Sequence, residues 1–255
     1  MVKIVRWLID YIYLTRGAAA MYWHKHPPSH YLDFILPDHT PVILIPGLLE
    51  KWGFMKNMGD FLSRQGHPVH VVPQLGYNIV SIPSAAKTVK FFLLHLLPGH
   101  THSIPVLSET AEHIRKLIDK HNLEHVVFVA HSKGGLIGKY YLVHHNHDSR
   151  VKGMVAIATP FTGSKIAKLV PHDSFREMRE GQKILHDLES HKAVNRKIIS
   201  MFPKFDNHIW VKDASYLEGA ENICLDTHGH HKVLFNKETK QHIVNAVEKL
   251  SRTLD

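Results

Sequence analysis

The chain has 255 residues, enough to bury the core of one α/β domain without a second globular unit. Its apolar fraction of 44% and charged fraction of 21% match globular proteins, and no repeat or low-complexity stretch occurs, which excludes fibrous, solenoid and disordered classes. The net charge of +8 comes from cations spread along the chain, so we expect no nucleic-acid partner. The single cysteine, Cys224, excludes an internal disulfide, and its apolar neighbours predict core packing.

The N-terminal residues form a predicted unit of their own. A helical projection of residues 2–14 places Lys3, Arg6 and Asp10 on one narrow stripe, and apolar side chains cover the rest. The charges and the shortness of the run, against the ~20 residues that span a bilayer, indicate neither a cleaved signal peptide nor a transmembrane anchor. We assign residues 1–25 to an amphipathic helix that either packs on the domain or makes peripheral membrane contact through residues 2–14, and we expect a cytoplasmic protein.

Residues 26–255 alternate between apolar runs and segments with helical periodicity. Runs rich in β-branched residues predict strands that are buried on both faces, as in a parallel sheet. The predicted strands are residues 41–46, 68–72, 126–130, 151–158, 197–202 and 222–225, and the predicted helices are residues 51–65, 108–121, 134–143 and 238–250. This order predicts an α/β fold, a mostly parallel, doubly wound sheet flanked by helices.

Two insertions interrupt this alternation, at about residues 77–105 and 161–195. The first contains the apolar patch Phe91-Phe92-Leu93-Leu94, which is typical either of a buried core helix or of a mobile apolar cap over an active site. The second is polar with a helical pattern. We predict that both are helical cap or lid insertions within the domain.

The segment from Val126 to Leu136 carries the strongest chemical signal. A buried strand leads into Ala130-His131-Ser132-Lys133-Gly134, and a helix follows. A serine on a sharp strand-to-helix turn needs small residues two positions before and after it, and Ala130 and Gly134 meet that demand. A chance coincidence of serine and glycine at a helix start is the alternative. The context favours a nucleophile elbow with Ser132 as the nucleophile.

A serine nucleophile requires a base and an oriented carboxylate, and in this type of fold both follow it in the chain. Asp206 comes directly after the predicted strand 197–202, which is the expected place for the acid. The loop after the last predicted strand supplies the base. Its candidates are His228, His230 and His231, and Asp213 and Asp226 are competing acids.

Together with the elbow, three further segments resemble bacterial lipases and esterases of the α/β-hydrolase superfamily. They are Asp206 through Ser215-Tyr216-Leu217-Glu218-Gly219-Ala220 to Gly229-His230, Ile45-Pro46-Gly47-Leu48-Leu49, and Ile157-Ala158-Thr159-Pro160-Phe161-Thr162-Gly163-Ser164. The resemblance covers about residues 40–250, with Pro46 and Phe161 where such lipases carry histidine. It implies that His230, which follows a glycine, is the base, with His228 second, and that the amides of Leu48 and Lys133 form the oxyanion hole.

The sequence therefore predicts a serine hydrolase that cleaves carboxylic esters, with lipid-like acyl esters as substrates, through Ser132, His230 and Asp206 and an acyl-enzyme. An acyltransferase or thioesterase with the same triad is one alternative, and a non-catalytic lipid- or partner-binding protein is another. We expect no cofactor and no metal. The histidines considered as ligands, His24, His26, His144, His145 and His147, lie in polar surroundings that predict solvated surface.

Overall fold

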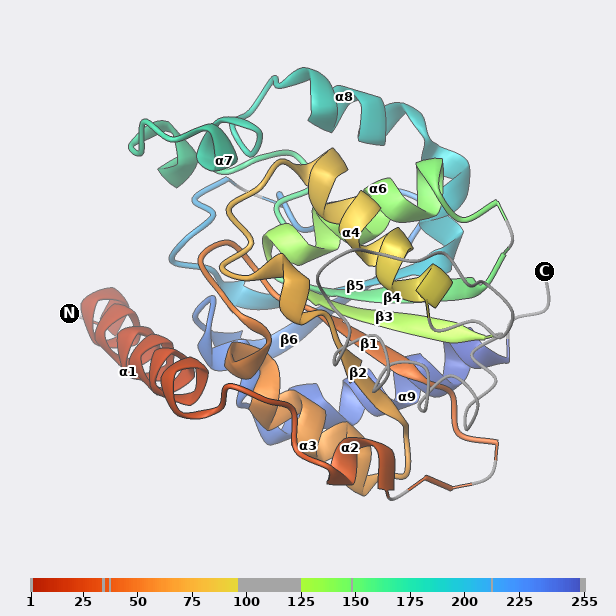
Figure 1. Cartoon of the computed structure of the whole chain (residues 1–255). Helices are drawn as coiled ribbons and strands as arrows, with labels where there is room; N and C mark the ends of the chain where they lie inside the picture. The colour runs from red at the N-terminus through yellow and green to blue at the C-terminus, as the bar shows by residue number, and fades with distance from the viewer. Residues whose placement is uncertain are drawn as a thin grey trace.

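The computed structural model describes residues 2–252 except residues 34, 37, 96–124, 148 and 212. Its centre is a six-stranded sheet in the order β2-β1-β3-β4-β5-β6, with helices on both faces (Figure 1). All neighbouring strands in it are parallel. The strands are β1 (Val42–Ile45), β2 (Val69–Val71), β3 (Val126–His131), β4 (Val151–Ile157), β5 (Ile198–Phe205) and β6 (Glu221–His228). This arrangement confirms the predicted fold class.

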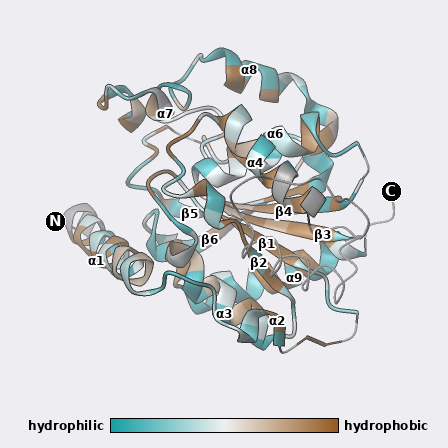
Figure 2. Cartoon of the chain, viewed as in Figure 1, coloured by the Kyte–Doolittle hydropathy of each residue, from teal (hydrophilic) through white to brown (hydrophobic). Residues whose placement is uncertain are grey.

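The strands separate two apolar cores because successive side chains point to opposite faces of the sheet. Ile43 and Ile45 face the core formed with α4 (Ile82–His95), α6 (Lys133–His144) and α8 (Lys183–Ser190). Val42 and Leu44 face the core formed with α3 (Lys56–Arg64) and α9 (Lys237–Ser251). The strands are accordingly the most hydrophobic part of the ribbon, whereas the helices alternate between polar and apolar residues (Figure 2). Both faces of the central strands are thus closed to water.

Several predicted boundaries differ from the observed ones. The helix expected over residues 51–65 divides into a 3-10 turn, Trp52–Met55, followed by α3. The helix expected over residues 108–121 lies outside the described residues. The core packing expected for Cys224 is wrong, because β6 is an edge strand and the Cys224 side chain is exposed.

The first insertion begins with a helix that belongs to the core. Ala85, Ala86 and Val89 of α4 are fully buried against α6, as is expected of a core helix rather than a loose cap. Of the apolar patch, Leu93 is buried, and the side chains of Phe91, Phe92 and Leu94 lie outside the description. The second insertion contains a 3-10 turn, Ile166–Lys168, and the helices α7 (Asp173–Arg176) and α8.

Helix α1 (Val2–Trp23) lies beside the sheet, at the left of Figure 1. It packs on the 3-10 turn Trp52–Met55, where Gly17 faces the ring of Phe54 and Gly53 faces the backbone of Met21. A short helix, α2 (His30–Asp33), connects it to the domain. Among the described residues, no helix combines the length and the apolarity that crossing a membrane requires. The domain boundary at residue 25 stays a prediction.

Candidate active site

Ser132 occupies the sharp turn between β3 and α6. Its backbone has φ 51° and ψ −121°, a conformation that a residue with a side chain rarely adopts. The turn is held by the main chain: the Ser132 amide donates to the carbonyl of Ile157 at 2.8 Å, and the Gly135 amide donates to the carbonyl of Ser132 at 3.0 Å. This geometry matches the turn expected from the small residues around the serine.

Gly134 shows why the turn demands a residue without a side chain. A Cβ at this position would lie 2.3 Å from the carbonyl oxygen of Ile45 and 2.8 Å from that of Pro46. Both oxygens belong to the backbone of the neighbouring strand and its exit, so neither moves aside cheaply. On the other side of the serine, Ala130 is fully buried between β1 and β4, where it pairs with Ile45 and Ala156.

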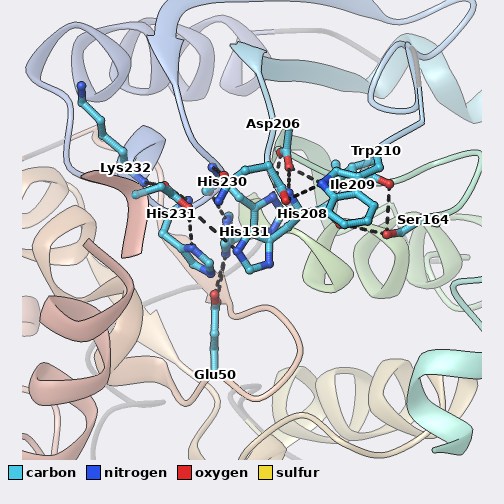
Figure 3. A network of polar contacts seen from close by, with 12 residues as sticks. Glu50, His131, Ser164, Asp206, His208, Ile209, Trp210, His230, His231 and Lys232 are labelled. Carbon is cyan, nitrogen blue, oxygen red and sulfur yellow. Dashed lines mark hydrogen bonds and ion pairs between the residues drawn. The ribbon is translucent and has the colours of Figure 1, made fainter. Parts of the chain in front are cut away.

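The structure brings Asp206 and His230 into direct contact. His230 Nδ1 lies 2.7 Å from Asp206 Oδ2, and both side chains are largely buried (Figure 3). Asp206 Oδ1 accepts hydrogen bonds from the backbone amides of His208 and Ile209 at 2.8 and 3.0 Å. Burial alone would raise the pKa of Asp206, but His230 and these amides outweigh it and lower the pKa. Burial likewise opposes the charge on His230, but the Asp206 carboxylate raises the pKa of that imidazole above its usual value.

The competing residues are placed elsewhere. His228 is the last residue of β6 and lies beside Phe205 of β5. Asp226 is exposed and forms an ion pair with Lys204 at 2.9 Å, and Asp213 is exposed in a turn. Of the acid and base candidates, Asp206 and His230 are therefore the pair that the structure places in contact.

The two predicted oxyanion-hole residues flank the serine from different segments. Leu48 follows β1 and lines the same pocket as Ser132. Lys133 begins α6, where first-turn amides have no partner within their own helix. The Lys133 ammonium is turned away into a buried site, where Nζ donates to the carbonyls of Asn78 at 3.1 Å and Val80 at 2.6 Å. Burial lowers the pKa of Lys133 to about 8.

A buried Glu50–His131 pair connects three segments of the site. Glu50 Oε2 accepts from the Gly47 amide at 2.7 Å, and His131 Nδ1 lies 2.9 Å from Glu50 Oε1. The other ring nitrogen of His131 donates to the carbonyl of His230 at 3.0 Å (Figure 3). Both ring nitrogens of His131 therefore face acceptor oxygens. The pair ties the loop after β1, the residue before the serine and the base to one another.

Asp10 of α1 contacts the loop after β6, residues 229–232, which carries the base candidate His230 and is called the base loop below. Its Oδ1 accepts the amides of His231 and Lys232 at 2.9 and 2.8 Å, and its Oδ2 lies 3.0 Å from His231 Nδ1. The carboxylate is fully buried, and burial opposes its charge, yet these contacts hold the pKa of Asp10 far below its ordinary value. Gly229 permits this approach, because a Cβ there would lie 2.3 Å from Asp10 Oδ1.

A pocket of about 330 Å³ opens at this edge of the sheet, and Ser132 and His230 both line it. Apolar side chains make up most of the remaining wall: Leu14, Met21, Leu48, Leu49, Phe54, Ile166, Ala167, Phe175, Met178 and Ile209. A second pocket, of about 640 Å³, lies at the amino ends of β1, β2 and β3 around Thr40 and His67, away from the serine. In parallel α/β sheets the carboxyl ends of the strands form ligand sites, which favours the pocket at Ser132.

Comparison with known proteins agrees with this architecture. Residues 40–189 match the family described as alpha/beta hydrolase fold. The chain belongs to the alpha/beta hydrolase fold family. No curated protein sequence matches it.

Solved structures share the hydrolase fold at low sequence identity. The mature lipase BlEst2 of Bacillus licheniformis is 14% identical, with a TM-score of 0.60 over 85% of this chain and 95% of that one. A carboxylesterase of Nitrososphaera gargenis is 12% identical, with a TM-score of 0.54 over 86% of this chain and 94% of that one. These likenesses establish the fold. Membership of the alpha/beta hydrolase family supports a hydrolase.

Sequence reasoning did not find several residues of the alpha/beta hydrolase site. The sequence assigns no role to Glu50, contains His131 only as a member of the elbow motif, and places Asp10 only in the polar stripe of the N-terminal helix. Their contacts join residues up to 222 positions apart. The one available signal was a charged residue on a mostly apolar helix, because such a residue is buried only where it finds partners.

Proposed function

We propose that the protein is a serine carboxylic-ester hydrolase that acts on lipid-like acyl esters. One observation supports this most directly: a strained serine and a histidine bonded to a buried carboxylate line the same apolar pocket. Strain at a functional turn persists only where the surrounding structure enforces it, as the backbone bonds of Ser132 do here. Because the chain belongs to the alpha/beta hydrolase fold family, we infer that this site transfers an acyl group to water.

In the proposed mechanism, Ser132 Oγ attacks the acyl carbonyl while His230 Nε2 takes its proton. Asp206 keeps the Nδ1 proton of His230 in place and stabilises the imidazolium that forms. The amides of Leu48 and Lys133 donate to the developing oxyanion. His230 then protonates the leaving alcohol. In the second half-reaction the same imidazole deprotonates a water molecule that attacks the acyl-enzyme, and it returns that proton to Ser132 Oγ as the acid leaves. Each step uses only groups of this chain and water.

The pocket wall favours an acyl chain over a polar substituent. The side chains that surround Ser132 are mainly aliphatic or aromatic, so an extended hydrocarbon is desolvated there at little cost. We expect esters of a given alcohol to be hydrolysed with a higher kcat/KM as the acyl chain lengthens from acetyl, until the pocket is filled.

A fluorophosphonate probe followed by peptide mapping tests the nucleophile. We expect labelling at Ser132, loss of labelling in Ser132→Ala, and turnover of p-nitrophenyl esters that tracks the labelled fraction. Labelling combined with acyl transfer to an added alcohol or thiol in preference to water would replace the hydrolase with a transferase. A folded protein that neither labels nor turns over any ester would instead be a binding protein.

Peripheral membrane contact through residues 2–14 belongs to the same proposal. On α1, the side chains of Leu8 and Ile12 are 62% and 65% exposed although Asp10 on the same helix is buried. Trp7 of α1 stacks on Trp210 at 5.7 Å, close to the pocket residues His208 and Ile209. An apolar helix face next to the substrate pocket suits contact with a lipid surface that holds the ester.

Sedimentation with phosphatidylcholine/phosphatidylglycerol vesicles tests this contact. The double variant Leu8→Gln/Ile12→Gln should bind vesicles more weakly and hydrolyse a soluble ester at the wild-type rate, because neither side chain lines the pocket. Tyr216→Ser, which removes an exposed aromatic side chain from the loop before β6, is the matched control. Equal vesicle binding by the wild type and the double variant would contradict membrane contact through this face.

A further inference from the structure

Three potential ligand side chains meet between α1 and the base loop. Asp10 comes from α1, His208 from the loop after β5 and His231 from the loop after β6. Asp10 Oδ2 is 3.0 Å from His231 Nδ1 and 4.0 Å from His208 Nε2, and the three ligand atoms lie within 4.8 Å of one another. The pocket of Ser132 is lined by both histidines.

One of these three ligand atoms, His208 Nε2, has no hydrogen-bond partner among the described residues. This nitrogen is also buried. A buried polar atom without a partner is unfavourable and calls for an explanation. In the tautomer that carries its proton on the other ring nitrogen, His208 Nε2 directs a lone pair toward the Asp10 carboxylate, and a cation bound between the two atoms would stabilise this arrangement.

Other atoms of the same residues hold the three side chains in place, while Asp10 Oδ2 and His231 Nδ1 also contact each other at 3.0 Å. Asp10 Oδ1 accepts hydrogen bonds from the amides of His231 and Lys232, and the backbone amide of His208 donates a hydrogen bond to Asp206 Oδ1. The rings of His208 and His231 lie 4.6 Å apart and nearly perpendicular, at 86°. One carboxylate oxygen and two imidazole nitrogens are therefore already close together before any ion binds.

We propose that Asp10, His208 and His231 bind a Zn²⁺ ion that ties α1 to the active-site loop. Two imidazoles and one carboxylate are a donor set that suits zinc. Tetrahedral ligands at about 2.0–2.1 Å from zinc lie about 3.3 Å from one another, and the two observed distances from Asp10 Oδ2 fall on either side of that value. The ion replaces the hydrogen between His231 Nδ1 and Asp10, and the ring proton of His231 moves to Nε2.

The protonation states support metal binding. Burial and the neighbouring rings lower the pKa of His208 to about 3, and burial also lowers the pKa of His231. Metal ligation requires neutral imidazoles and an ionised carboxylate, and the direction of these pKa shifts agrees with the geometry on which the site depends. Three protein ligands leave a fourth position for water. This site differs from the expectation of no metal, which had weighed only histidines nearby in sequence.

Metal titration of the purified full-length protein tests the site without reference to catalysis. After chelator treatment, we expect Co²⁺ to give the visible absorption bands of a four-coordinate ion, with Zn²⁺ displacing it and raising Tm by mass action. His208→Gln should lower the affinity for both ions by more than about 100-fold. Loss of a direct ligand should cost more than loss of an outer-shell partner, which lowers metal affinity by roughly 10- to 100-fold.

A second variant tests whether surface histidines, rather than the buried site, bind the metal. His144 lies 2.8 Å from Asp187 at the surface, with His191 close by, and His144→Gln removes this alternative cluster. The proposal requires the Co²⁺ bands and the Zn²⁺ effect on Tm to survive in His144→Gln and to disappear in His208→Gln. If His208→Gln keeps both, the metal binds adventitiously and the buried site is wrong. Near-UV circular dichroism verifies that the two variants are folded.

Discussion

The serine side of the site and the base side are built in different ways. Ser132 is positioned by one continuous segment, β3 and the start of α6, and by main-chain bonds to neighbouring strands. His230 is positioned by side chains from distant segments: Asp206, Asn207, the carbonyl contact of His131, and Asp10 through the adjacent residues. The first side depends on backbone geometry, and the second depends on buried polar contacts that are costly to leave unsatisfied. The two sides should therefore fail differently when mutated.

The largest expected effect comes from the reacting groups themselves. Ser132→Ala and Asp206→Asn should lower kcat for ester hydrolysis by about 10⁴- to 10⁶-fold, because a triad acts as a unit. Ser132→Ala should leave the free energy of unfolding nearly unchanged, whereas Asp206→Asn should also lower it, because the Asp206 carboxylate accepts three hydrogen bonds in a buried site. Steady-state kinetics and urea denaturation check both expectations. A kcat within tenfold of the wild type for either variant would contradict the assigned triad.

The serine side should break by steric strain. Gly134→Ala puts a Cβ 2.3 Å from a backbone oxygen, so we expect a loss of about 3 kcal/mol in the free energy of unfolding, with reduced labelling of Ser132. Gly138→Ala on the same helix is the matched control. Its Cβ would meet Met154 Sδ at a similar distance, but that atom belongs to a flexible side chain that moves aside. We expect about 1 kcal/mol or less for it, and equal losses for the two variants would refute the steric account.

The base side should break by loss of buried hydrogen bonds. Asp10→Ala leaves two buried amides and the His231 ring without their acceptor, so the free energy of unfolding should fall by about 2–3 kcal/mol. The base loop also loses its anchor, and kcat should fall by about 10- to 100-fold. Measurements in chelator-treated buffer separate this effect from metal binding. Asp213→Asn, at an exposed turn whose left-handed backbone (φ 56°) an asparagine tolerates, should change stability by less than about 0.5 kcal/mol.

The same contrast explains what the sequence could predict. The strand order along the chain, the two-faced burial of β1, β3 and β4, and the turn at Ser132 all follow from local patterns of apolar and small residues, and the structure has them where they were expected. The acid and base candidates followed from their positions after β5 and β6. The contacts of Asp10, Glu50 and His131 join residues 81 to 222 positions apart, and no local pattern encodes such a pairing.

The exposure of Cys224 was mispredicted for a related reason. An apolar run predicts a strand, but it does not say whether that strand lies at the centre or the edge of the sheet. Among the strands that the structure describes, β6 has one neighbour, β5, and most of its side chains, including Cys224, are at least partly open to water. The order of strands in space is a long-range property, like the anchoring of the base loop.

The smallest expected effect concerns the histidine that the sequence left as second choice. His228 ends β6, two residues before His230, and burial lowers its pKa, with Arg6 the next contributor. Because His230 and not His228 lies against Asp206, His228→Gln should change kcat by less than about 2-fold, the size of an ordinary surface substitution. His230→Gln in the same assay should lose about 10⁴-fold or more. A reversed order of these two losses would move the base to His228 and would require the loop after β6 to rearrange when substrate binds.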